Sequence, residues 1–171
     1  MSETKAKGAR QAAKDARKVP MRDFSQSLPM ALLRAREAVM RQFRPNLRAH
    51  GLTEQQWRIL RALAAVDSIE VTELARVAFL LGPSLSRILR DLEARGLIQR
   101  EVDARDMRRG VLSISAKGMK LIAQVAPGSE AIYASIASHY GARKLAALQK
   151  MLAELEGSLA QFGASDEADD A

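Results

Sequence analysis

The sequence of 171 residues contains no cysteine, which excludes disulfides, thiol redox sensing and cysteine-ligated metal sites. Its two histidines, His50 and His139, lie far apart along the chain, so we expect no structural zinc site. No apolar run reaches the roughly 18 residues of a membrane-spanning helix, and the N-terminus lacks the apolar stretch of a secretory signal. We therefore expect a cytoplasmic protein without metal or cofactor and without contact to a membrane.

Aromatic residues are also scarce, at 4%, whereas hydrophobic residues as a whole make up 47% and alanine and leucine are abundant. This balance favours helices over a sandwich or barrel, so the expected fold class is mostly α. The sequence has no glycine-rich phosphate loop, no nucleophile motif and no histidine near an acid. We therefore expect no catalytic residues and no enzymatic activity.

Acidic residues are outnumbered, with 20 Asp and Glu against 27 Lys and Arg, so the chain carries a formal charge of +7. Basic residues are dense in residues 1–22, which we expect to form a flexible arm, and acidic residues end the chain in an expected disordered tail at 164–171. The body between them remains basic. This charge is compatible with a polyanionic partner such as nucleic acid, although many proteins are simply basic.

Apolar periodicity divides residues 23–163 into helices around one short hairpin. We expect the following elements, in chain order: a helix over 28–50 interrupted near Pro45, a helix from the capping-box pair Thr53 and Gln56 to about Asp67, a short helix over 71–79 with Leu74 and Val77 inward, a helix over 83–95, strands over 97–102 and 111–115, a long helix from the N-cap Ser115 to about Tyr140, and a last helix over 143–162. A trihelical core followed by a two-stranded hairpin predicts a winged helix-turn-helix over residues 53–115.

The helix over 83–95 has two distinct faces. Leu85, Ile88, Leu89 and Leu92 share one arc, and the opposite face carries four candidate DNA-contacting residues: Ser84, Ser86, Arg87 and Arg90. An arginine fork matches guanine O6 and N7 in the major groove, so Arg87 is the candidate for base contact, while Ser84 and Ser86 lie near the helix N-terminus, where phosphate is favoured. The alternative is a solvated face on which Arg87 merely pairs with Asp91.

The loop between the two strands is rich in charge. It contains Asp103, Arg105, Arg108 and Arg109. An arginine at the tip of a narrow hairpin can enter a minor groove, and Asp103 can hold Arg105 by a charge-assisted hydrogen bond. We therefore interpret this loop as a DNA-binding wing.

These residues resemble the DNA-binding core of the MarR family of transcriptional regulators. The shared motifs are the Glu-Leu-Ala helix (73–75), the Leu-Glu-x-x-Gly-Leu-Ile segment (92–98), the Asp-x-Arg wing (103–105) and Gly118; one departure is Ser115, where the family usually has threonine. A narrower resemblance, over Phe43 to Pro45 and His50 to Arg58, points to the branch that represses operons for degradation of homoprotocatechuate, an aromatic acid.

The resemblance implies a homodimer in which residues 23–50 and 116–163 form the dimerisation helices and two winged parts bind a near-palindromic operator in double-stranded DNA. It also implies a small-molecule effector, an aromatic acid or its CoA thioester, that relieves repression. Candidate pocket residues are Arg34, Arg36, His50, Trp57 and Arg58. Each has a simpler interpretation, since Trp57 suits a core, His50 a loop and the arginines a solvated surface or interface ion pairs. Open alternatives are a regulator of drug or stress responses, an activator, or a non-specific architectural protein that binds nucleic acid.

Overall fold

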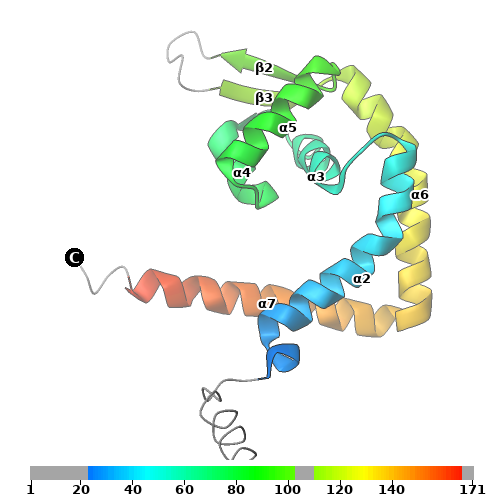
Figure 1. The fold of residues 1–171 in the computed structure, drawn as a ribbon, viewed down its shortest axis with the longest axis vertical. Coiled ribbons are helices and arrows are strands. Elements are labelled where there is room, and N and C mark those ends of the chain that lie inside the picture. The colour runs from blue at the N-terminus through cyan, green and yellow to red at the C-terminus, as the bar shows by residue number, and fades with distance from the viewer. Residues whose placement is uncertain (1–22, 103–109, 167–171) are drawn as a thin grey trace, which may run out of the picture. The chain divides into compact units, whose positions relative to one another are not determined.

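The structure is a computed structural model that describes residues 23–102 and 110–166. It is mostly helical with one small antiparallel sheet, which confirms the expected fold class (Figure 1). The expected arm over 1–22, the hairpin tip at 103–109 and residues 167–171 of the expected tail lie outside the described residues. The elements are η1 (Phe24–Gln26), α2 (Leu28–Ala49), α3 (Glu54–Leu63), β1 (Ile69–Glu70), α4 (Val71–Ala78), α5 (Gly82–Ala94), β2 (Ile98–Val102), β3 (Gly110–Ile114), α6 (Ala116–Tyr140) and α7 (Ala142–Asp166).

The chain divides into two units between Arg41 and Gln42, within α2. In the second unit α2 continues through Pro45, so the expected interruption near this residue was wrong. A proline inside a helix removes one backbone hydrogen bond and its ring crowds the carbonyl of residue i−4, but contacts with α6 hold this part of α2. The Phe43 ring lies 4.9 Å from that of Tyr133, and Asn46 Nδ2 donates to the Val125 carbonyl at 3.2 Å. Tertiary contacts therefore outweigh the local effect of the proline.

The core of the winged part lies between α3, α4, α5 and the sheet (Figure 1). The capping box predicted at the start of α3 is confirmed, because Thr53 Oγ1 accepts from the Gln56 N–H and Gln56 Oε1 accepts from the Thr53 N–H. The helix ends at Leu63 rather than near Asp67, and a turn leads from there into β1. Fully buried side chains from every layer meet here: Ile59, Leu60, Leu63, Leu74, Leu85, Leu89, Leu92 and Leu112.

The short helix α4 corrects one predicted inward residue. Leu74 is buried as expected, but Val77 is 38% exposed and Ala78 is buried in its place. The inward face runs through positions 71, 74, 75 and 78, the i, i+3, i+4, i+7 pattern, and Val77 lies roughly 110° from the centre of that arc at about 100° per residue.

The predicted hairpin is confirmed, and the sheet has a third strand that the sequence did not indicate. The strand order is β1-β3-β2, all antiparallel, with Ile98 opposite Ile114 and Ile69 opposite Leu112. At two residues, β1 is too short to show alternation. It fixes the chain entering α4 against the base of the hairpin.

The last two helices are long and incompletely covered. Ser115 caps α6 as predicted, with its hydroxyl accepting from the Gly118 N–H at 3.0 Å. On α7, Met151, Leu152 and Leu159 are 57%, 41% and 56% exposed. None of the helices described in the structure has the length and apolarity to cross a membrane. The apolar side chains of α7 are thus left facing solvent in the single chain.

Candidate nucleic-acid interface

Helix α5 begins and ends as the sequence predicted. Gly82 and Pro83 open it, a position where proline's missing N–H costs nothing, and Gly96 follows its end at φ +68, a left-handed conformation that suits glycine. The four side chains predicted to face inward are at most 9% exposed: Leu85, Ile88, Leu89 and Leu92. They fix the orientation of α5 on the core.

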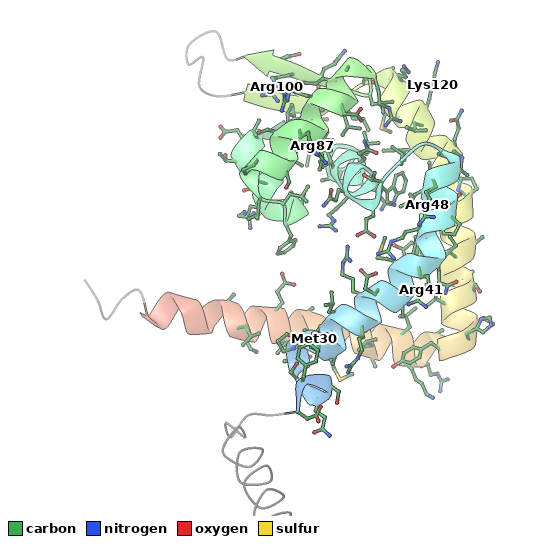
Figure 2. The ribbon with its side chains drawn as sticks, in the orientation of Figure 1. Met30, Arg41, Arg48, Arg87, Arg100 and Lys120 are labelled. Carbon is green, nitrogen blue, oxygen red and sulfur yellow. The ribbon has the colours of Figure 1, made fainter. Side chains whose placement is uncertain are left out.

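The four candidate residues on the opposite face of α5 are all exposed: Ser84, Ser86, Arg87 and Arg90. Asp91, the alternative partner of Arg87, instead accepts a hydrogen bond from Gln56 at 2.7 Å and pairs with Arg95 at 3.4 Å. Arg87, labelled on α5 in Figure 2, makes no ion pair with any residue that the structure describes. The outward face of α5 therefore presents hydroxyls and an available guanidinium group.

Of the wing, the structure describes the two strands β2 and β3 but not the loop that joins them. The four predicted wing residues, Asp103, Arg105, Arg108 and Arg109, lie outside the described residues. At the base, Arg100 Nε of β2 pairs with Glu93 Oε1 of α5 at 2.7 Å (Figure 2). Arg100 was not among the predicted site residues. This ion pair ties the strand that leads into the wing to the helix that carries Arg87.

Gln56 was predicted only as a capping residue, but in the structure it has a second role. Its amide oxygen accepts from the Thr53 N–H at 2.8 Å, and its amide nitrogen donates to Asp91 Oδ2 of α5. One side chain thus fixes the start of α3 and holds α5 against it. A capping-box motif specifies only the first of these bonds.

Replacing Gln56 with glutamate separates these two roles. We expect Gln56→Glu to keep the capping box, because a carboxylate also accepts from the Thr53 N–H, but to place a negative charge beside Asp91. DNA affinity should fall by about fivefold, the value of one lost hydrogen bond. Fluorescence anisotropy with a labelled duplex measures the change. Adding Asp91→Asn should recover most of the loss, since an amide can donate to Glu; equal loss in both variants would contradict a positioning role.

Three of the five effector candidates, Arg34, Arg36 and His50, make separate local contacts. Arg34 donates to the Ser25 carbonyl at 2.6 Å, and Arg36 pairs with Glu37 at 2.9 Å. His50 Nδ1 lies 2.9 Å from the Asn46 carbonyl oxygen, so the residue that follows α2 bonds back to its last turn. Each of these side chains thus has a partner near it in sequence.

Trp57 and Arg58 are neighbours on α3, but the structure gives them different partners, and Arg61 is the arginine that lies over Trp57. Arg58 donates to the Ala78 carbonyl at 2.8 Å and so holds the end of α4. The guanidinium carbon of Arg61 lies 5.8 Å from the centre of the Trp57 ring, a cation–π distance. Arg61 is exposed and makes no ion pair within the described ranges. Its spacing of four residues from Trp57 was the signal in the sequence that could have identified it.

One exposed ion pair belongs to the Glu-Leu-Ala helix. Glu73 accepts from Arg76 at 2.9 Å, and this hydrogen bond holds the pKa of Glu73 below its ordinary value and raises that of Arg76. Both groups therefore remain charged at neutral pH on the surface of α4. Residues 23–102 and 110–166 contain no cluster of three side chains suited to bind a metal ion.

Comparisons with known proteins agree with this geometry. A model of the MarR family matches residues 50–109. The homoprotocatechuate degradative operon repressor of Escherichia coli is 41% identical over 128 residues, covering 75% of this chain and 86% of the repressor. A crystal structure of NadR in complex with 4-hydroxyphenylacetate is 39% identical, with a TM-score of 0.68, covering 80% of this chain and 97% of NadR.

A DNA complex is also among the similar structures. The transcriptional repressor CouR, bound to a 23-mer DNA duplex, is 28% identical with a TM-score of 0.71, and the match covers 81% of this chain and 98% of CouR. The resemblance read from the sequence, both to the family and to its homoprotocatechuate branch, is confirmed. At 41% identity to a repressor that it covers almost in full, the chain belongs to the MarR family of transcriptional regulators.

Proposed function

We propose that this protein is a repressor of an operon for aromatic-compound catabolism, and that an aromatic effector releases it from DNA. The observation that carries the proposal is the outward face of α5, where Arg87 is exposed and the serines flank it at the N-terminal end. Arg87 contacts guanine in the major groove, Ser84 and Ser86 bind phosphate, and Arg90 contacts base or phosphate. The protein acts on DNA in the cytoplasm and catalyses no reaction.

The wing extends this contact in the proposal. Arg105 enters the adjacent minor groove, Asp103 orients it, and Arg108 and Arg109 contact phosphates. The Arg100–Glu93 pair supports this role, because it fixes the direction in which β2 leaves α5.

A homodimer supplies the second copy of this surface. The exposed apolar side chains of α7 are those that a partner chain would cover, among them Met151, Leu152 and Leu159. Two α5 helices then bind half-sites about one turn of DNA apart, roughly 34–36 Å. A near-palindromic operator follows from that two-fold symmetry.

The effector is proposed to be a phenolic or other aromatic acid. NadR was crystallised with 4-hydroxyphenylacetate, and the relative from Escherichia coli represses a homoprotocatechuate operon. In this chain the Trp57 ring can pack against the aromatic ring of the effector. Arg61, whose guanidinium group lies over the Trp57 ring, can bind the carboxylate of the effector. Arg58 is assigned a positioning role, while Arg34, Arg36 and His50 remain candidates for the polar end of the ligand. An aryl-CoA thioester is the alternative ligand.

The proposal is tested by selecting the operator from a pool of random duplexes with the full-length protein. Sequencing should give a near-palindrome, and 4-hydroxyphenylacetate or a related phenolic acid should release the labelled operator in an anisotropy titration. Release only by the CoA thioester would favour the alternative ligand. A pool that remains random after selection would contradict sequence-specific repression.

The effector site gives its own prediction. Arg61→Ala should abolish the rise in melting temperature that a phenolic acid causes in the wild type, while its melting temperature without ligand changes little, because Arg61 is exposed. Arg58→Ala is the matched comparison: it loses the bond to the Ala78 carbonyl and should melt lower without ligand. Thermal shift with and without ligand measures both variants. A full ligand-induced shift in Arg61→Ala would refute its assignment.

A further inference from the structure

The turn that leads into α5 exposes two large apolar side chains. Leu81 is 80% exposed and Phe79 is 78% exposed, the two highest values among the exposed large hydrophobic residues of the described chain. Leu80 between them packs against the core. Single exposed hydrophobic residues are common on protein surfaces, but turns usually carry polar residues or glycine, so two together at this place call for a physical reason.

The turn is held firmly rather than left loose. Phe79 has φ 50 and ψ 51, the left-handed region that an aromatic residue rarely adopts. The Leu80 N–H donates to the Ala75 carbonyl at 3.0 Å, and Arg58 binds the carbonyl of Ala78. These bonds fix an unfavourable backbone conformation, a feature that is concentrated at functional sites.

Leu81 also occupies a position where a polar residue would stabilise the helix. It is the N-cap of α5 and makes no side-chain capping bond. Serine, threonine, aspartate or asparagine would satisfy a free N–H here, so leucine forgoes that stabilisation. The N-terminal end of a recognition helix is the end that approaches base edges, and Ser84 lies one turn further along the same helix.

We propose that Leu81 contacts the 5-methyl group of a thymine in each half-site and so specifies thymine at that position. The thymine methyl is the apolar group that the major groove offers, and an exposed leucine fixed at the entrance of α5 matches it. Leu81 lies at the N-terminal end of α5, beside the exposed Ser84, and this is the end that approaches base edges in the proposed complex; DNA is therefore the proposed occupant rather than a second protein surface. This inference rests on the proposed function.

The test removes the methyl group alone. In the selected operator each thymine is replaced in turn by deoxyuridine, and affinity is measured by anisotropy for the full-length protein. We expect the wild type to lose about fourfold at one thymine per half-site, the effect of one buried methyl group. Leu81→Ala should bind the unmodified operator more weakly and should be indifferent to deoxyuridine at that position. Val66→Ala, a change at another exposed apolar residue, should behave as the wild type.

A second variant separates loss of the thymine contact from loss of stability. Leu81→Asn supplies a good N-cap, so its melting temperature should equal or exceed that of the wild type while its discrimination between thymine and deoxyuridine disappears. Equal deoxyuridine effects in wild type and Leu81→Ala would overturn the inference and leave the proposed function standing. A change of oligomeric state in Leu81→Ala would also overturn it, because the residue would then contact protein. Failure to select any operator would overturn the proposed function itself.

Discussion

Arg87→Ala is expected to weaken binding to the selected operator by about tenfold or more and to relax the base preference at one position of each half-site. A bidentate arginine–guanine contact contributes about 1–3 kcal/mol of discrimination, and Arg87 is exposed without an ion pair in the part of the chain that the structure covers. Anisotropy competition with single-base variants of the operator measures both effects.

Arg90→Ala is the matched comparison on the same face of α5. Arg90 already makes a long hydrogen bond of 3.4 Å to the Ser86 carbonyl. If Arg90 binds phosphate, Arg90→Ala should lower the affinity for all duplexes by the same factor and reduce the dependence of affinity on salt. Unchanged affinity and unchanged preference in Arg87→Ala would remove Arg87 from the interface.

The second large effect is on stability, at Gly118 in the first turn of α6. A Cβ at Gly118 would lie 2.7 Å from Ile114 Cγ1 and closer still to the backbone carbonyl oxygen of Leu97, which itself accepts from the Ser115 N–H. The Leu97 carbonyl is backbone held by this hydrogen bond and cannot move freely, so Gly118→Ala should lower the free energy of unfolding by about 3 kcal/mol. Urea denaturation at a fixed protein concentration measures this, because dimerisation makes stability depend on concentration.

Gly157→Ala supplies the control for helix propensity. Gly157 lies within α7, and a Cβ there would meet no atom within 4 Å. Replacing a glycine inside a helix by alanine should then stabilise the protein by up to about 1 kcal/mol. The two substitutions are chemically identical and should have opposite signs. A stabilising Gly118→Ala would show that α6 does not pack against Leu97 as described.

Local patterns predicted most of the fold. The spacing of Leu85, Ile88, Leu89 and Leu92 sufficed to place α5 and its outward face, and Thr53 with Gln56 placed the start of α3. Features set by distant contacts were not predictable in this way. The continuity of α2 through Pro45 depends on Tyr133 and Val125 of α6, and β1 exists because it pairs with β3.

In the candidate site, too, some residues could be predicted from local patterns and others could not. Ser84, Ser86, Arg87 and Arg90 follow from helical periodicity alone. The second bond of Gln56 and the bond from Arg58 to the end of α4 require side-chain geometry that no spacing specifies, whereas the i, i+4 spacing of Trp57 and Arg61 did indicate their contact. The residues proposed to bind the effector are accordingly the part of the candidate site that the sequence specifies least.

The central claim, specific recognition of DNA by α5, is tested most directly by one competition measurement. Labelled operator bound to the full-length protein is displaced by unlabelled operator or by a scrambled duplex of equal composition, at one fixed salt concentration. The operator should compete at least about 10³-fold better than the scrambled duplex, as expected for a specific regulator. Equal competition by the two duplexes would contradict the claim and leave a protein that binds DNA only through its charge.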